Sequence, residues 1–251
     1  MGIIATDLDG TLFKGQTLID GVKEGLNEII NNGIEIYYTT NNSSQSPIEI
    51  KDKLENLLQL NIDISKIISP LIIFENLYRG SKRNIFIYGS DNLKKYIKNL
   101  NMNETSLENA EFILIGRKER NNYSQINDII KNVRLGKDIV CLNKDLTFPT
   151  EFGEHAGNGA VVKIIEDELS INISTLGKSG NYYSSYFIQN KININFVIGD
   201  RVDTDIIFGK NLNAKTFLVS SGIKNYLDVN IADIQLNKFS DVVPFITKNS
   251  Q

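Results

Sequence analysis

The sequence predicts an α/β protein, with a Rossmann-like core built on a parallel sheet and a smaller α/β domain inserted into it. Short apolar and β-branched runs alternate along the chain with segments that carry apolar residues three or four positions apart. The runs are typical of buried strands, and the spaced segments are typical of amphipathic helices. Strand, helix and strand in succession form right-handed crossovers, which place the strands parallel in one sheet.

The core begins with a strand over residues 3–6, an apolar and β-branched run that leads into two aspartates. Val22 and Leu26 then lie on one face of a helix, which the pair Asn32-Gly33 ends. The same patterns predict the rest of this part of the core, namely strands over 34–39 and 67–69 and helices over 47–58 and 70–78.

The polar, turn-rich segment 79–82 indicates a domain junction, after which strands and helices alternate again. The inserted domain is predicted to hold strands over 84–88, 111–115 and 138–142 and helices over 91–100, 123–133 and 159–169. The core is predicted to resume with a helix over 182–189, a strand over 194–198, a helix over 206–212, a strand over 215–219 and a short edge element over 241–243. We therefore expect core residues 1–80 and 175–251 to flank a domain of residues 81–174.

Length and composition are those of an ordinary soluble globular protein, with 251 residues and a net charge of −3. This charge argues against nucleic-acid binding, which requires cations to neutralise phosphates. The N-terminus lacks the regions of a secretory signal, and no apolar run reaches the ~20 residues that span a bilayer. The single cysteine, Cys141, excludes an internal disulfide and fits a reducing compartment. We expect a cytoplasmic protein that binds neither nucleic acid nor membrane.

Polar side chains occur at four comparable places in the predicted core. Because the carboxyl ends of parallel strands meet at one edge of the sheet, these side chains are expected to converge there. Each has an alternative interpretation: a solvated Asp-x-Asp-Gly turn, a helix N-cap at Thr40, a surface lysine at Lys178 and a strand-ending turn at Asp200. The residues concerned are Asp7, Asp9, Thr40, Asn41, Lys178, Asp200 and Asp205.

Together these side chains favour phosphoryl transfer. Two carboxylates about 4 Å apart repel by roughly 4 kcal/mol at an effective dielectric of about 20, so Asp7 and Asp9 require a cation or a shared proton. A transferring phosphoryl group calls for a divalent metal and a lysine, and Mg²⁺ prefers a few carboxylates, such as Asp7 and Asp200. The Thr40 hydroxyl and nearby backbone amides can hold the remaining oxygens. With no serine–histidine pair evident, a carboxylate is the natural nucleophile.

The order of these motifs resembles the haloacid dehalogenase-like (HAD) phosphatase superfamily over nearly the whole chain. The matching segments are 7–11 (Asp-Leu-Asp-Gly-Thr), 40–42 (Thr-Asn-Asn), 177–178 (Gly-Lys) and 199–205 (Gly-Asp, then Thr-Asp). Segments 39–44, 145–149 and 157–160 are similar to its NagD-like, p-nitrophenylphosphatase branch. That branch usually has Pro where this chain has Ala156 and Ser179. Loss of Pro frees the backbone but removes no catalytic side chain.

The resemblance implies a role for each matched position. Asp7 would attack phosphorus and form an aspartyl-phosphate, while Asp9 would protonate the leaving group and later activate water. Thr40, Asn41 and Lys178 would bind the phosphoryl group, and Lys178 would also neutralise the charge of the nucleophile. Mg²⁺ would be held by Asp7, the Asp9 carbonyl and Asp200. The site would be supported by Asp205 and Asn42.

The resemblance also implies that the inserted domain is an α/β cap that closes over the site and selects the substrate. Phe148, Glu154 and His155 lie in the predicted loop facing the site, so they are candidates for substrate specificity. Packing within the cap is the alternative for Phe148 and His155. The implied substrate is a small phosphate monoester, for example a sugar, glycerol or nucleotide phosphate, and a homodimer through the cap is a possible assembly.

Two other functions are alternatives. A phosphoaspartate signalling or binding protein without turnover also joins acidic residues, Thr and Lys around Mg²⁺, but the insert and the late Asp200 and Asp205 count against it. A metal-dependent glycosyltransferase could use Asp7 and Asp9, although such a pair would normally follow a nucleotide-binding half of the chain.

Overall fold

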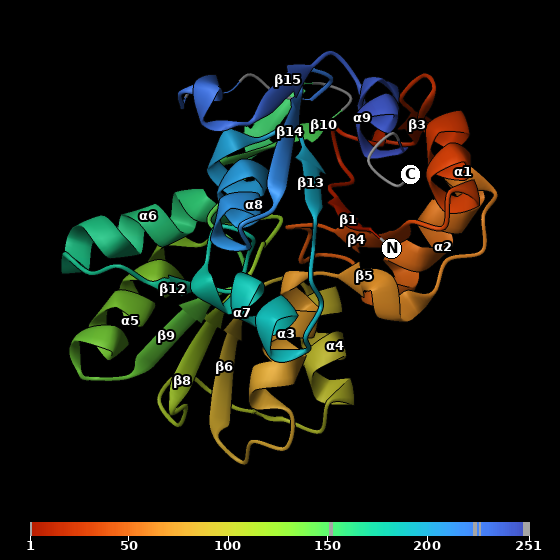
Figure 1. The fold of residues 1–251 in the computed structure, drawn as a ribbon. Helices are drawn as coiled ribbons and strands as arrows, with labels where there is room; N and C mark the ends of the chain where they lie inside the picture. Colours follow the sequence, from red (N-terminus) through yellow and green to blue (C-terminus); the bar gives the residue numbers. More distant parts are fainter. Residues whose placement is uncertain (1, 151–152, 223–224, 226, 248–251) are drawn as a thin grey trace.

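A six-stranded parallel sheet forms the centre of the core (Figure 1). The computed structural model describes residues 2–150, 153–222, 225 and 227–247. The strand order is β15-β14-β13-β1-β4-β5, so the N-terminal strand β1 lies in the middle of the sheet. The strands are β1 (Ile3–Thr6), β4 (Glu35–Thr39), β5 (Ile67–Ile68), β13 (Phe196–Gly199), β14 (Lys215–Val219) and β15 (Ile234–Leu236).

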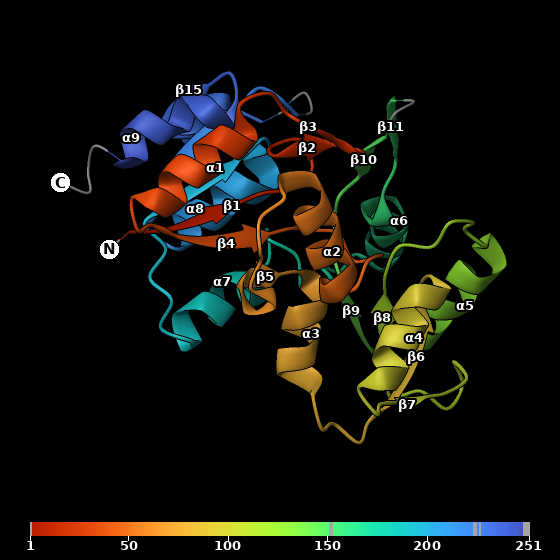
Figure 2. The same cartoon turned by 90° about the vertical axis from the view of Figure 1, so that its right-hand side faces the viewer.

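Helices cover both faces of this sheet because successive strand residues point to opposite sides (Figures 1 and 2). Ile4 of β1 packs in one apolar cluster, and its neighbour Ala5 packs in the other. The first cluster is covered by α1 (Val22–Asn31), α2 (Pro47–Leu58) and α9 (Val243–Thr247). The second is covered by α3 (Pro70–Tyr78), α7 (Asn181–Gln189) and α8 (Ile207–Asn211).

A second parallel sheet has the strand order β12-β9-β8-β6-β7. Its strands come from the part of the chain that separates the two core segments in the sequence. Its strands are β6 (Asn84–Tyr88), β7 (Asn103–Glu104), β8 (Phe112–Ile115), β9 (Asp138–Cys141) and β12 (Ser174–Thr175). One face packs on α5 (Tyr123–Arg134) and α6 (Asn158–Leu169), with Cys141 buried between them. The other shares an apolar cluster with α4 (Asp91–Asn99) and the core helix α3. The predicted fold class is therefore confirmed, while the boundaries at residues 80 and 174 stay predictions.

The structure corrects the prediction for the C-terminal segment. Residues 241–243 were expected to form an edge element, but Phe239–Val242 is a 3-10 helix that leads into α9, and the edge strand is β15. The reason is the helical spacing of Phe239, Val242, Val243 and Ile246, which are all buried in the first apolar cluster.

Two short hairpins were not predicted. One pairs β2 (Phe13–Lys14) with β3 (Thr17–Leu18), and the other pairs β10 (Thr147–Thr150) with β11 (Gly153–Ala156). Helical structure also begins earlier than expected after β13, because Val202–Ile206 forms a π-helical turn ahead of α8. Among the described residues, no helix combines the length and the apolar composition needed to cross a bilayer.

Candidate active site

The predicted polar residues converge at the carboxyl edge of the core sheet. Asp7 follows β1, Thr40 follows β4 and Asp200 follows β13, while Lys178 lies between β12 and α7. All four line one cavity of about 480 Å³. Residues of the second sheet close the opposite wall of this cavity, so the site lies between the two sheets. The sequence predicted the convergence of Asp7, Thr40 and Asp200, since β1, β4 and β13 are parallel in one sheet. Lys178 reaches the same cavity after β12, which belongs to the second sheet and not to the core sheet.

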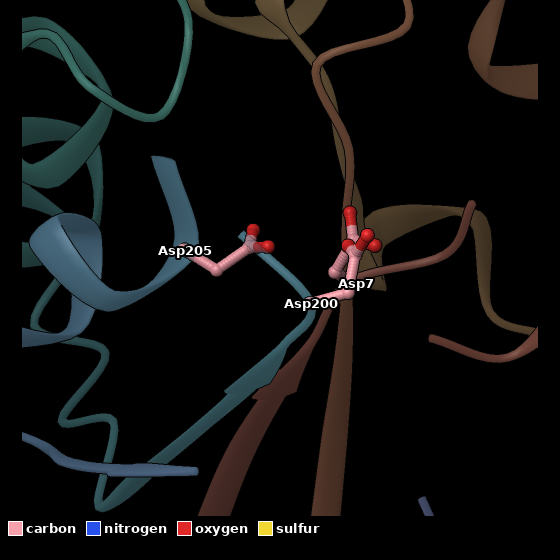
Figure 3. Close-up of side chains that lie close together, drawn as sticks. All are labelled: Asp7, Asp200 and Asp205. Atoms are coloured by element: carbon pink, nitrogen blue, oxygen red, sulfur yellow. The ribbon is translucent and has the colours of Figure 1, made fainter. Parts of the chain in front are cut away.

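Three buried carboxylates, which Figure 3 shows, cluster with one buried lysine beside the cavity. Asp7, Asp200 and Lys178 line the cavity, whereas Asp205 does not. Oxygen atoms of Asp7, Asp200 and Asp205 lie within 4.8 Å of one another, and Asp205 points toward the other two from the helical turn after β13. Lys178 Nζ lies 2.5 Å from Asp7 Oδ1 and 2.8 Å from Asp205 Oδ1. The Lys178 side chain is only 1% exposed, so it is a buried bridging cation and not the surface lysine of the alternative interpretation.

This cluster carries more negative than positive charge. Burial raises the pKa of Asp7 although Lys178 opposes the shift, and burial raises the pKa of Asp205 to about 6. Burial also disfavours the charged form of Lys178, but Asp205 and Asp7 outweigh it and raise the lysine pKa, so the lysine stays protonated. One lysine faces three carboxylates, and a divalent cation would compensate the excess charge.

The oxygen donors fit Mg²⁺, which binds carboxylates and keeps several waters. Asp205 already accepts hydrogen bonds from Lys178 Nζ and, through Oδ2, from the Arg201 backbone N–H at 3.1 Å. Asp7 also accepts two hydrogen bonds, from Lys178 Nζ and from Thr11 Oγ1 at 3.1 Å. Asp7 and Asp200 line the cavity and Asp205 does not, so the first two are the better candidates for direct ligands and Asp205 is suited to support Lys178. The Asp200 carboxylate rests against two glycines: a Cβ added to Gly222 would come 1.7 Å from Asp200 Oδ2, and one added to Gly10 would come 2.6 Å from it.

The Asp9 side chain lies apart from the carboxylate cluster but still lines the cavity. Its Oδ1 atom is 3.7 Å from Nζ of Lys53, which reaches in from α2 and lies 3.8 Å from the centre of the Phe13 ring. The role of the Asp9 carbonyl as a metal ligand stays a prediction.

The Thr40 hydroxyl and the Asn41 side-chain amide form different hydrogen bonds. Thr40 Oγ1 accepts a hydrogen bond from the Asn42 N–H, and the N-cap of α2 is Ser46, so the alternative that Thr40 caps this helix is wrong. The Asn41 side chain is fully engaged, since it donates to Asp145 Oδ1 at 2.8 Å and accepts from the Lys178 backbone N–H at 2.8 Å. Within the described part of the chain, the Asn41 backbone N–H donates to no other group.

Asn42 forms hydrogen bonds within the loop after β4, and its role as a supporting residue stays a prediction. Its Oδ1 accepts from the backbone N–H and the hydroxyl of Ser44, and its Nδ2 donates to Gln45 Oε1. These bonds fix the turn that presents Thr40 and the Asn41 N–H to the cavity.

The three candidates from the cap differ in position. Phe148 lines the cavity, but Glu154 and His155 do not. The predicted loop is replaced here by the paired strands β10 and β11. His155 packs edge-on against Phe148, with ring centres 5.9 Å apart. Glu154 accepts a hydrogen bond from Thr147 Oγ1 at 2.7 Å. These contacts give both residues a structural place within the hairpin.

Sequence reasoning missed several polar residues that line the cavity from the second sheet. They include Arg117, Asn143 and Asp145, together with Arg201 from the core. Asp145 is held by Asn41, and the Arg201 guanidinium donates to Asp203. The available signal was again position, since Arg117 follows β8 and Asp145 follows β9 at the carboxyl ends of parallel strands.

Comparisons with known proteins agree with this arrangement. Residues 4–103 match the family model for haloacid dehalogenase-like hydrolases, and residues 187–241 match a second HAD-hydrolase-like model. An acid sugar phosphatase from Staphylococcus epidermidis is 27% identical over 234 residues, which are 91% of this chain and 90% of the relative. One from Staphylococcus haemolyticus is also 27% identical, covering 98% of this chain and 96% of the relative.

Solved structures share the fold along the whole chain. A p-nitrophenyl phosphatase from Archaeoglobus fulgidus superposes with a TM-score of 0.85 at 20% identity, covering 97% of this chain and 98% of that one. A glycerol phosphate phosphatase from Mycobacterium tuberculosis, solved in complex with magnesium, has a TM-score of 0.80 at 20% identity, covering 96% of this chain and 75% of that one. With the matched motifs gathered in one cavity, the chain belongs to the haloacid dehalogenase-like hydrolases.

Proposed function

We propose that this protein is a Mg²⁺-dependent phosphatase that hydrolyses small phosphate monoesters through an aspartyl-phosphate at Asp7. The observation that carries the proposal is the position of Asp7, whose carboxylate faces the cavity while Lys178 Nζ holds its Oδ1 at 2.5 Å. The names of the sequence relatives, acid sugar phosphatases, support the reaction class.

In the first step, an oxygen of Asp7 forms a bond to phosphorus while the bond between phosphorus and the alcohol oxygen breaks. Asp9 donates a proton to that departing oxygen, and the alcohol leaves. In the second step, Asp9 takes a proton from water as the water oxygen attacks phosphorus, which releases phosphate and restores the Asp7 carboxylate. Asp7 and Asp200 would hold Mg²⁺, which supplies positive charge to the transferring phosphoryl group when bound.

Several groups are placed to hold the phosphoryl oxygens. The Thr40 hydroxyl and the Lys178 ammonium line the cavity beside Asp7. Within the described residues, the backbone N–H groups of Asp9 and Asn41 are both unused by other partners. Preorganised donors of this kind stabilise the charge that develops on transferring oxygens. Asn41 would therefore act through its backbone, because its side chain is engaged elsewhere.

The substrate class follows from the cavity and from the relatives. The lining is mostly polar, with hydroxyl, amide and charged side chains and Phe148 as the aromatic surface. A volume of about 480 Å³ accommodates a small ester. Sugar and glycerol phosphates fit this description, in keeping with the names of an acid sugar phosphatase and a glycerol phosphate phosphatase among the similar proteins.

The test is phosphate release from a panel of sugar, glycerol, nucleotide and nitrophenyl phosphates, measured in Mg²⁺ and again in EDTA. The proposal predicts release from several members in Mg²⁺ and none in EDTA. Stable phosphorylation of the protein without release of phosphate would instead support a phosphoaspartate binding or signalling role. Equal release in EDTA would contradict the metal dependence.

A further inference from the structure

The basic side chains that line the cavity are unequally paired. Of Arg117, Lys178 and Arg201, the last two form ion pairs: Lys178 with Asp7 and Asp205, and Arg201 with Asp203 at 2.7 Å. Arg117 forms no ion pair and no hydrogen bond with any residue that the structure describes. Of the three basic groups that line this cavity, it is therefore the one without a counter-ion among the described residues.

Arg117 is nevertheless held in place. It lies in the segment between β8 and α5, and its guanidinium carbon is 3.8 Å from the centre of the Phe148 ring. Stacking on an aromatic ring fixes the plane of a guanidinium while leaving its N–H groups free to donate. Both Arg117 and Phe148 line the cavity; Arg117 follows β8 of the second sheet, and Phe148 lies in β10.

The electrostatics favour an anion at this point. Arg117 is half-buried, and burial lowers the pKa of its guanidinium, with Glu119 opposing the shift. Glu119 also lines the cavity, but it is exposed and lies beyond ion-pair distance of Arg117. A partly desolvated cation without a counter-ion is unfavourable, and a ligand anion would remove that cost.

We propose that Arg117, stacked on Phe148, is a second anion subsite, and that the preferred substrates are phosphate monoesters whose alcohol part carries a further carboxylate or phosphate. This inference rests on the proposed function, since it assigns the far end of the same substrate. The reacting phosphate lies at Asp7 and Lys178, and the second anion lies across the cavity at Arg117. Arg117 is then a specificity residue that contacts substrate without contacting the reacting phosphorus.

The experiment compares matched pairs of esters in Mg²⁺ with the full chain. One pair is 3-phosphoglycerate and glycerol 3-phosphate, which differ in a carboxylate. The other is propane-1,3-diol bisphosphate and 3-hydroxypropyl phosphate, which differ in a phosphate. We expect the wild type to show a higher kcat/KM for the charged member of at least one pair by about 10-fold or more, the size of a hydrogen-bonded charge contact. The pair that shows it identifies the second anion as carboxylate or phosphate.

The variants are Arg117→Met, Arg117→Lys and, as a matched control, Arg120→Met on the same loop, where Arg120 is exposed and does not line the cavity. Arg117→Met is expected to lower kcat/KM about 10- to 100-fold for the ester that carries a second anion. The kcat/KM for the ester without a second anion should stay almost unchanged. Arg117→Lys should retain part of the preference, and Arg120→Met should retain all of it.

Two results would overturn the subsite. One is a wild type that turns over both members of each pair equally well, which needs no variant to be folded. The other is an Arg117→Met variant that loses activity equally on esters with and without the second anion, which would indicate a structural role against Phe148. Both differ from failure of the proposed function, in which the wild type releases no phosphate from any ester.

Discussion

Asn41 Nδ2 donates a hydrogen bond of 2.8 Å to Asp145 Oδ1, which joins the loop after β4 of the core to the segment after β9 of the second sheet. The other end of the same amide accepts from the Lys178 backbone N–H. Burial raises the pKa of Asp145 to about 6, although Arg201 and the Asn41 hydrogen bond oppose the shift. One side chain thus connects the backbone at Lys178 to Asp145 in the segment after β9.

Asn41→Ala is therefore expected to reduce activity without removing a group that would contact phosphate. Loss of the amide leaves Asp145 and the Lys178 N–H without their partner, and misplacement of a catalytic group by ~1 Å costs about 100-fold in rate. We expect kcat/KM to fall about 10- to 100-fold, and amide hydrogen exchange at residues 143–146 and 177–178 to become faster. Unchanged exchange at these residues would contradict a connecting role for Asn41.

Lys53 is predicted to orient Asp9 for proton transfer, because its Nζ lies 3.7 Å from the Asp9 carboxylate. Lys53→Met should slow hydrolysis of glycerol 3-phosphate by about tenfold, a fraction of the 100-fold or more that general acid catalysis supplies. Hydrolysis of p-nitrophenyl phosphate should change much less, since nitrophenolate leaves without protonation. Lys51→Met, on the same helix and paired with Glu55, is the control. Equal slowing of both esters would indicate another role for Lys53.

Gly222 is predicted to control metal affinity although it offers no ligand side chain. A methyl group there would come 1.7 Å from Asp200 Oδ2, so Gly222→Ala must displace the Asp200 carboxylate. Displacing a ligand through its surroundings typically costs about 10- to 100-fold in metal affinity. We expect the Mg²⁺ concentration for half-maximal phosphate release to rise by such a factor. Gly2→Ala, whose added carbon meets nothing closer than 3.9 Å, should leave that concentration unchanged.

Asp233 is predicted to stabilise the fold in a pH-dependent way. Burial opposes its ionisation, but hydrogen bonds from Lys210 and Thr216 outweigh it and lower the pKa to about 2. A folded-state pKa below the unfolded value gives stability that is present above pH ~4 and is lost as the pH falls toward 2. Because the side chain is 38% exposed, we expect only about 1 kcal/mol from it at pH 7.

The measurement is the unfolding free energy of wild type and Asp233→Asn from urea denaturation at pH 7 and pH 3. The difference between the two proteins should be smaller at pH 3. A difference that grows on acidification would show that Asp233 is not held as a low-pKa carboxylate in the folded protein.

The parallel core could be predicted from the sequence because its strands are continuous apolar runs. The strand over residues 3–6 was predicted to the residue, since Ile3–Thr6 is apolar or β-branched and Asp7 ends it. Asp7, Thr40, Lys178 and Asp200 were expected to converge because parallel strands share one carboxyl edge. This reason holds for Asp7, Thr40 and Asp200, whereas Lys178 follows β12 of the second sheet. The outcome was different for 241–243, which was predicted to be a short edge element although the spacing of its apolar pair with Phe239 and Ile246 is helical.

The contacts across the cavity could not be predicted, because they depend on how the two sheets pack. Nothing local to Arg117 or Asp145 indicates that the first stacks on Phe148 or that the second meets Asn41, 104 positions away in the chain. The pairing of β10 with β11 was also missed. These strands are short, polar and without apolar alternation, so they lack the pattern on which strand prediction depends.

The most direct test of the central claim is phosphate release by Asp7→Asn in Mg²⁺, beside wild type and the exposed control Asp52→Asn. Circular dichroism and thermal unfolding would establish that each variant is folded. If Asp7 is the nucleophile, Asp7→Asn releases no phosphate from any ester that the wild type hydrolyses, while Asp52→Asn retains full activity. Phosphate release by a folded Asp7→Asn at a rate near that of the wild type would contradict the account, because it would require a nucleophile other than Asp7.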